Sequence, residues 1–85
     1  MDLDNLIDMA NRIGEFFDSL PDQHEAADSI ADHIRRFWEP RMRLAILNSL
    51  DDAEASSAMH PIVREALTDH RQDLTPAAAA PAAVG

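Results

Sequence analysis

Four histidines are the side chains of this sequence best suited to acid–base or metal chemistry: His24, His33, His60 and His70. Only His24 has two carboxylates at helical spacing on its own face, Asp28 at i+4 and Asp32 at i+8. An imidazole and two carboxylates are able to hold a divalent ion. Polar residues at this spacing are common on solvated helix surfaces, however, so the sequence predicts no metal-binding residue.

The acidic group Asp51, Asp52 and Glu54 is a second candidate for metal binding. It lacks the glycine and the later bidentate glutamate that a calcium loop needs, so we interpret it as part of a solvated loop. The sequence contains no cysteine, which excludes a disulfide, a thiolate metal site, an iron–sulfur ligand and a cysteine nucleophile. We therefore predict that this chain has no catalytic residue and binds no cofactor of its own.

The tripeptide Asp18-Ser19-Leu20 also occurs around the modified serine of acyl and peptidyl carrier proteins, which are acidic helical domains of similar length. In those carriers the serine begins the second helix near mid-sequence, where the helix dipole favours a phosphate. Ser19 comes too early in this chain and is followed by Leu20-Pro21. The context therefore argues against a carrier function.

The most distinctive cluster combines arginines with aromatic residues around one proline. Four of the seven basic residues lie within nine positions, on both sides of Phe37, Trp38 and Pro40; they are Arg35, Arg36, Arg41 and Arg43. Arginine and aromatic residues together also bind nucleic acid. Glu39 inside the cluster and a formal net charge of −9 argue against that function.

Two roles for this cluster remain. In one, Trp38 caps the helical core while the arginines pair with nearby acids. In the other the cluster faces a partner protein, which the enrichment of Trp and Arg at interface hot spots favours. We therefore predict a partner interface, together with the apolar side of the first helix, made of Phe16, Phe17, Arg35, Arg36, Phe37, Trp38, Pro40, Arg41 and Arg43.

Helical periodicity predicts the elements that position these residues. A first helix is indicated by apolar residues at i, i+3 and i+4, with Met9 and Phe16 widening the apolar face and Gly14 marking a close helix crossing; the periodic residues are Leu3, Leu6, Ile7, Ala10, Ile13, Phe17 and Leu20. Pro21 ends it, and a second helix is predicted from about Asp22 to Phe37. Its buried stripe comprises Ala27, Ile30, Ile34 and either Phe37 or Trp38, with Asp28, Asp32 and Arg36 forming an acid–base ladder on another side.

The second half of the chain predicts shorter elements. A third helix follows Pro40, with Met42, Ala45, Ile46, Ser49 and Leu50 on its inner face. Residues 51–58 are predicted to be a loop, and a short helix begins at His60-Pro61 and carries Ile62, Val63, Ala66 and Leu67. The predicted fold is an all-α bundle of three to four short helices over residues 1–72, with a flexible, disordered Ala/Pro-rich tail over residues 73–85.

Composition limits what such a domain can do. Of its 85 residues 46% are hydrophobic, but 15 are alanines, six of them in the last nine positions, so the core is too small to enclose an active site. A second protein surface would stabilise the chain. The N-terminus lacks the basic and apolar regions of an export signal, and no apolar run approaches the roughly 20 residues of a membrane span. We expect a cytoplasmic location and no membrane or nucleic-acid binding.

Three segments carry a family resemblance: Met9-Ala10-Asn11-Arg12-Ile13-Gly14-Glu15-Phe16-Phe17, His33-Ile34-Arg35-Arg36-Phe37-Trp38-Glu39-Pro40-Arg41-Met42-Arg43 and Pro61-Ile62-Val63-Arg64-Glu65-Ala66. They resemble the delta subunit family of NAD-dependent formate dehydrogenases. The spacing of the first two also agrees with the family. The loop from Asp51 to Met59 and the Ala/Pro tail depart from it.

The resemblance implies an accessory, non-catalytic subunit of a soluble, cytoplasmic, molybdenum-dependent complex that oxidises formate to carbon dioxide and reduces NAD. The alpha subunit of that complex is expected to hold bis-MGD molybdenum and iron–sulfur clusters, while beta and gamma subunits handle FMN, further clusters and NAD. The delta subunit is expected to bind alpha and support assembly, stability or molybdenum-cofactor retention. The alternative is a small acidic helical regulator or adaptor unrelated to formate oxidation.

Overall fold

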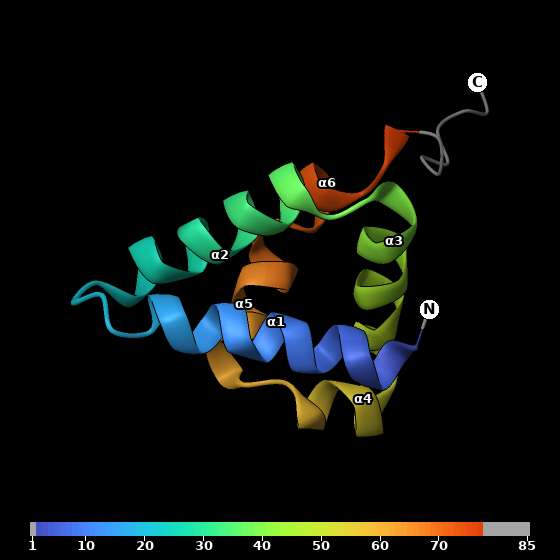
Figure 1. The fold of residues 1–85 in the computed structure, drawn as a ribbon, viewed down its shortest axis with the longest axis horizontal. Coiled ribbons are helices and arrows are strands. Elements are labelled where there is room, and N and C mark those ends of the chain that lie inside the picture. The colour runs from blue at the N-terminus through green and yellow to red at the C-terminus, as the bar shows by residue number, and fades with distance from the viewer. Residues whose placement is uncertain (1, 78–85) are drawn as a thin grey trace.

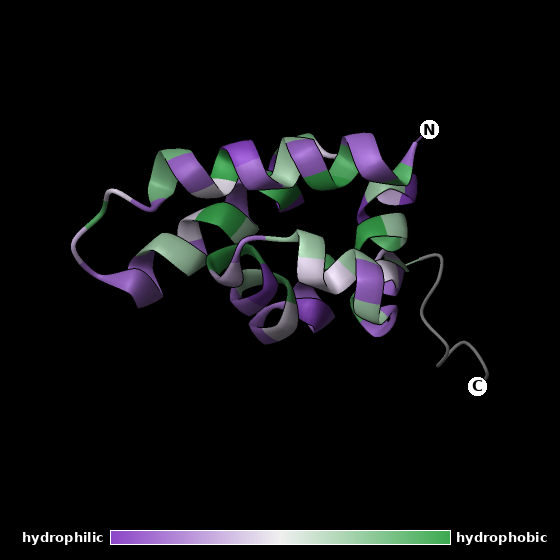
Figure 2. Ribbon diagram, turned by 90° about the horizontal axis from the view of Figure 1, so that it is seen from below, coloured by the Kyte–Doolittle hydropathy of each residue, from purple (hydrophilic) through white to green (hydrophobic). Residues whose placement is uncertain are grey.

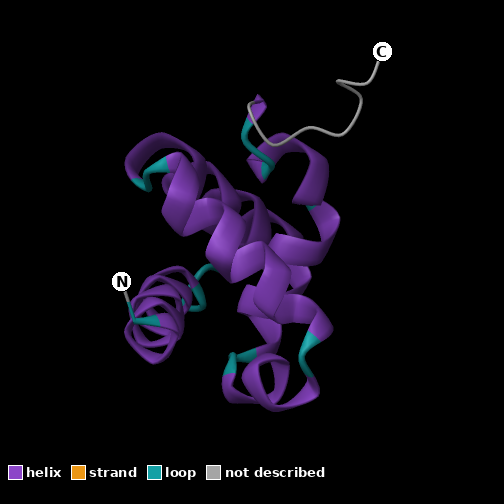
Figure 3. Cartoon of the chain, turned by 90° about the vertical axis from the view of Figure 1, so that its right-hand side faces the viewer, coloured by secondary structure: helices purple, strands orange, loops and turns teal. Residues whose placement is uncertain are grey.

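The computed structural model describes residues 2–77, and helices make up nearly all of this part (Figures 1 and 3). Four helices have nine or more residues: α1 (Leu3–Phe17), α2 (Gln23–Phe37), α3 (Pro40–Asn48) and α5 (Pro61–Asp69). A 3-10 turn (Ser49–Asp51), α4 (Ala53–Ala58) and α6 (Arg71–Leu74) are shorter. No strand occurs within residues 2–77, and the predicted all-α bundle of three to four main helices is confirmed.

The helices begin where the sequence supplies a cap or a proline. The side chain of Asp2 accepts a hydrogen bond from the Asp4 amide at 3.1 Å, and that of Asp22 accepts one from the His24 amide at 2.9 Å. These bonds satisfy amide groups that the first turn of a helix leaves free. Helices α3 and α5 instead begin with Pro40 and Pro61, which lack the amide hydrogen that would need a partner.

The core lies where α5 packs across α1 and α2, while α3 closes one end of the bundle (Figure 1). Ile30, Ile34, Val63 and Leu67 are fully buried there. The predicted close crossing at Gly14 is confirmed, because a Cβ atom at this position would lie 2.7 Å from Val63 Cγ2. Helix α1 also has a hydrophobic turn at its C-terminal end, beside the loop to α2 (Figure 2).

The prediction of a loop over residues 51–58 was wrong, because α4 occupies Ala53–Ala58. Asp52 caps this helix by accepting a hydrogen bond from the Glu54 amide at 3.0 Å, and Ala55 is buried in the core. Small, polar residues suggested a loop, but alanine has the highest helix propensity and aspartate is a strong N-cap. The cap and the buried alanine therefore favour a helix where the composition suggested a loop.

Asn11 joins α1 to the turn between α4 and α5. Its Nδ2 donates to the carbonyl of Ala58 at 3.0 Å, and its Oδ1 accepts from the His60 amide at 2.8 Å. His60 Nε2 lies 2.8 Å from Glu15 Oε2, so α1 contacts this turn through two residues on one face, one helical turn apart. Arg64 Nη1 donates to the carbonyls of Ser56 and Met59 and closes the same turn.

The last described residues pack against the bundle. Helix α6 extends to Leu74, which is 1% exposed, and Pro76 is also buried. The boundary predicted between residues 72 and 73 therefore falls inside α6, and residues 73–77 include core contacts. The rest of the predicted tail, residues 78–85, lies outside the described residues.

Candidate functional site

Four aromatic rings form a continuous row across α1 and α2. The rings of Phe16 and Phe17 meet edge to face with centroids 5.0 Å apart, Phe17 lies 6.4 Å from His33, and His33 lies 4.8 Å from Phe37. We call these four residues the aromatic ladder. Its end members, Phe16 and Phe37, are 73% and 70% exposed. A packed row that leaves two large apolar side chains in solvent is suited to contact with another protein.

Local structure explains why Phe37 and not Trp38 faces solvent. His33 and Phe37 are four residues apart and therefore share one side of α2. Pro40 disfavours helical backbone at Glu39, whose ψ angle is 154°. Trp38 before it is also extended, with a ψ angle of 137°, so the chain leaves the helix at these two residues. This turn places the indole of Trp38 in the core, where it is 6% exposed. The buried stripe of α2 thus ends in Trp38.

Two shallow hollows flank the aromatic ladder and share Phe17 and His33. The first, of about 360 Å³, is mostly apolar and is lined by Arg12, Ile13, Phe16, Phe17 and His33. The second, of about 450 Å³, is lined by Phe17, Glu25, Asp28, Ser29, Asp32, His33, Arg36 and Phe37. His33 was not among the predicted interface residues, although its i, i+4 relation to Phe37 was visible in the sequence.

The ladder region gathers four of the nine predicted interface residues: Phe16, Phe17, Arg36 and Phe37. The other five lie elsewhere. Trp38 is in the core and Pro40 is exposed at the start of α3. Arg35 lines a hollow beside α6, whereas Arg41 lies near the N-terminal half of α1.

Arg43, the last of the five, is half-buried. Its Nη1 donates to the carbonyl of Arg35 at 3.4 Å, at the C-terminal end of α2, where helix carbonyls lack partners. The cluster that is contiguous in sequence is therefore dispersed in space. The partner interface stays a prediction, and the predicted residues that lie together are those of the ladder region.

Asp32 holds the two arginines of α2. Arg35 Nη2 and Arg36 Nε each lie 3.1 Å from one of its carboxylate oxygens. Desolvation alone would raise the pKa of Asp32, but hydrogen bonds and charge attraction from Arg35 and Arg36 outweigh it and hold that pKa below the usual value. This part of the predicted acid–base ladder is confirmed, whereas Asp28 pairs with a different helix.

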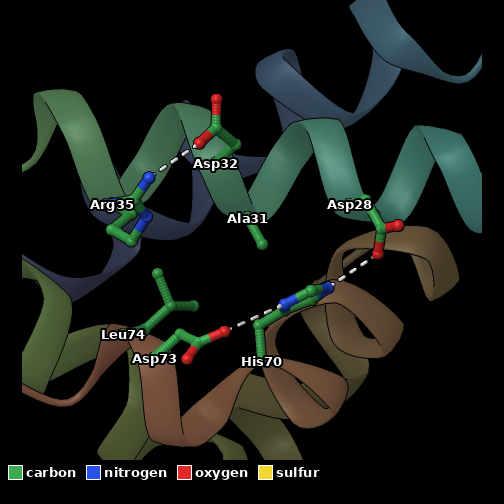
Figure 4. A pocket seen from close by; sticks show the side chains of 7 residues that line it. All are labelled: Asp28, Ala31, Asp32, Arg35, His70, Asp73 and Leu74. Carbon is green, nitrogen blue, oxygen red and sulfur yellow. Dashed lines mark hydrogen bonds and ion pairs between the residues drawn. The ribbon is translucent and has the colours of Figure 1, made fainter.

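His70, at the junction of α5 and α6, is the partner of Asp28 (Figure 4). Its Nε2 lies 2.8 Å from Asp28 Oδ1 on α2, and its Nδ1 lies 3.6 Å from Asp73 Oδ2 on α6. The hydrogen bond with Asp28 raises the pKa of His70 above its ordinary value; partial burial opposes this and Asp73 adds to it. The imidazole thus connects the junction of α5 and α6 to α2 and to the body of α6.

This contact predicts a pH-dependent part of the stability. Because the pKa of His70 is raised on folding, the stability that His70 contributes is fully present below its ordinary pKa of 6.5. This stability is lost as the pH rises through the pKa of His70 in the folded state. In urea unfolding followed by circular dichroism, the coupling between His70→Gln and Asp28→Asn should be larger at pH 5.5 than at pH 8.5. We expect the coupling energy to be less than about 1 kcal/mol, because solvent screens the pair. Equal coupling at both pH values would contradict this assignment.

The structure does not gather His24, Asp28 and Asp32, since Asp28 contacts His70 and Asp32 contacts arginines. Among residues 2–77, the one group with ligand atoms near enough for a metal ion is His24, Glu65 and Asp69, all within 4.8 Å of one another. These side chains are solvent-facing, and His24 Nδ1 is 3.7 Å from Glu65 Oε2. The contact joins α2 to α5 as an ordinary surface ion pair when His24 is protonated.

No helix among the described residues is long and apolar enough to cross a membrane. The fold and the ladder together define a small acidic helical protein whose most distinctive surface is an exposed row of aromatic side chains.

Residues 5–67 match the model of the family described as the NADH-dependent formate dehydrogenase delta subunit, FdsD. The match covers most of the sequence, and the chain belongs to this family. All three segments that carried the resemblance lie within the matched residues, so the predicted family is confirmed. Comparison with curated proteins and comparison with solved structures each gave no match.

Proposed function

We propose that this delta subunit binds the catalytic alpha subunit of NAD-dependent formate dehydrogenase through the aromatic ladder, and that it supports assembly, stability or molybdenum-cofactor retention there. The observation that carries the proposal is the 73% and 70% exposure of Phe16 and Phe37 at the two ends of one packed aromatic row. Burying an exposed phenylalanine side chain contributes roughly 1.5–3 kcal/mol. Two such side chains on one face supply the apolar centre of an interface.

Association through the ladder leaves the bundle intact. Helices α1 and α2 already bury their inner sides against α5, so Phe16 and Phe37 are not needed to complete the core. A chain that binds only the folded, cofactor-loaded alpha subunit would shift the equilibrium towards that state by mass action. This is how a small protein without chemistry of its own stabilises a large catalytic subunit.

The proposed role is non-catalytic and cytoplasmic. The redox groups belong to the other subunits: bis-MGD molybdenum and iron–sulfur clusters in alpha, with FMN, further clusters and the NAD site in beta and gamma. This chain has no cysteine to contribute to an iron–sulfur cluster. Its contribution is the surface that it presents to alpha.

The proposal predicts a defect in molybdenum content when the chain is missing. Affinity purification of the tagged chain from its native cells should recover a large formate-oxidising complex that contains molybdenum and iron. Complex purified from cells that lack the chain should contain several-fold less molybdenum per alpha subunit, and re-expression of the chain should restore it. Recovery of the chain alone would contradict binding to alpha, whereas unchanged molybdenum content and complex yield would contradict the supporting role.

A further inference from the structure

The second hollow beside the aromatic ladder has two chemically different walls. Phe17, His33 and Phe37 provide aromatic rings on one side. The other side is acidic, with Glu25, Asp28 and Asp32 at i, i+3 and i+7 along the same surface of α2. Rings and carboxylates both attract a cation, so the hollow favours positive charge along its length.

The cations of the chain itself leave part of this attraction unused. Arg36 lines the hollow, but its Nε is held 3.1 Å from Asp32 Oδ2. Asp28 contacts His70 outside the ladder. Within residues 2–77, Glu25 has no ion-pair partner, although it lies in the first turn of α2 at the edge of the hollow. A positive group from another molecule would meet a free carboxylate there.

We infer that the partner inserts an arginine or lysine side chain, carried on an apolar segment, into the hollow between the aromatic ladder and Glu25. The apolar residues of that segment cover Phe16 and Phe37, and its cation pairs with Glu25 at the other end of the hollow, twelve residues and roughly 18 Å from Phe37 along α2. The inference rests on the proposed binding of the catalytic subunit and adds the chemistry of the contact. The occupant is thus an apolar segment with a basic side chain.

The charge of the whole chain favours such an occupant. A protein of formal charge −9 attracts a locally positive surface and repels a negative one. A second copy of the chain also carries −9, so self-association through this face brings like charges together. Nucleic acid is disfavoured for the same reason.

The test compares Glu25→Arg with Glu54→Arg. Both residues are exposed glutamates in the first turn of a helix, so the two variants change the net charge equally and each removes a favourable charge from a helix N-terminus, but Glu54 lies on α4 away from the ladder. Binding is measured with the purified formate dehydrogenase catalytic subunit by biolayer interferometry. We expect Glu25→Arg to weaken binding about 10-fold or more at low salt, and Glu54→Arg to change it less than about 3-fold.

Two further measurements distinguish the inference from the proposed function. Phe37→Leu keeps an apolar side chain but removes the ring that the partner segment covers, and it should weaken binding several-fold. The difference between Glu25→Arg and Glu54→Arg should shrink when the salt concentration is raised to 0.5 M, because exposed charge pairs are screened. If Glu25→Arg and Glu54→Arg bind alike at low salt while Phe16→Ala/Phe37→Ala abolishes binding, the aromatic ladder is the docking surface but the proposed pairing of a partner cation with Glu25 is wrong. If neither Glu25→Arg nor Phe16→Ala/Phe37→Ala weakens binding, the cation contact and the proposed docking through the aromatic ladder are both wrong.

Discussion

A variant with Phe16→Ala and Phe37→Ala is expected to lose most of its binding to the catalytic subunit of formate dehydrogenase while keeping its fold. Both side chains are largely in solvent, so their removal should change the free energy of unfolding by no more than about 0.5 kcal/mol each. Aromatic hot-spot residues typically cost 2 kcal/mol or more on truncation, which is roughly a 30-fold loss of affinity for each. Two of them together should reduce recovery of the complex below detection.

The measurement is co-purification of the catalytic subunit with the tagged chain, with circular dichroism to verify the fold. Gln72→Ala, which removes an exposed side chain from α6 away from the ladder, is the surface control and should behave as wild type. Phe16→Leu and Phe37→Leu should give intermediate losses, because they keep apolar area without the rings. Wild-type recovery by the double alanine variant would show that the ladder is not the docking surface.

The helices and their starts could be predicted because local signals and tertiary packing agree. Asp22 caps α2 where it was expected, and Pro40 and Pro61 begin α3 and α5. Helix α4 was missed because its five small residues and one glutamate give no apolar stripe, although the cap at Asp52 was present. The extension of the core to Leu74 was also hidden, since one buried leucine carries no periodicity.

The candidate site was less predictable, because neighbours in sequence need not be neighbours on a helix. Successive helical residues are rotated by about 100°, so Arg35 and Arg36 face different hollows although they are adjacent. The choice between Phe37 and Trp38 depended on how the chain turns before Pro40, which the sequence left open. The contact of His33 with Phe17 joins two helices and depends on tertiary packing that no local pattern reports.

The largest effect on stability is expected for Trp38→Ala. The indole is 6% exposed and belongs to the same core as Ile34 and Ile46. Truncating a buried tryptophan typically costs about 3–5 kcal/mol, because the transferred surface is lost and a cavity remains. Domains of this size have little more stability than that. The variant should therefore be largely unfolded at 37 °C, as measured by far-ultraviolet circular dichroism and urea titration.

Trp38→Phe should retain more of the packing and lose less stability, which makes it the matched comparison. Loss of partner binding by Trp38→Ala would then follow from unfolding, unlike the loss expected from Phe16→Ala/Phe37→Ala, which leaves the helices intact. The opposite pattern is equally informative. If Trp38→Ala keeps wild-type stability yet no longer binds the catalytic subunit, the indole acts in the interface, as first predicted from the arginine–aromatic cluster, and its place in the core does not determine its function.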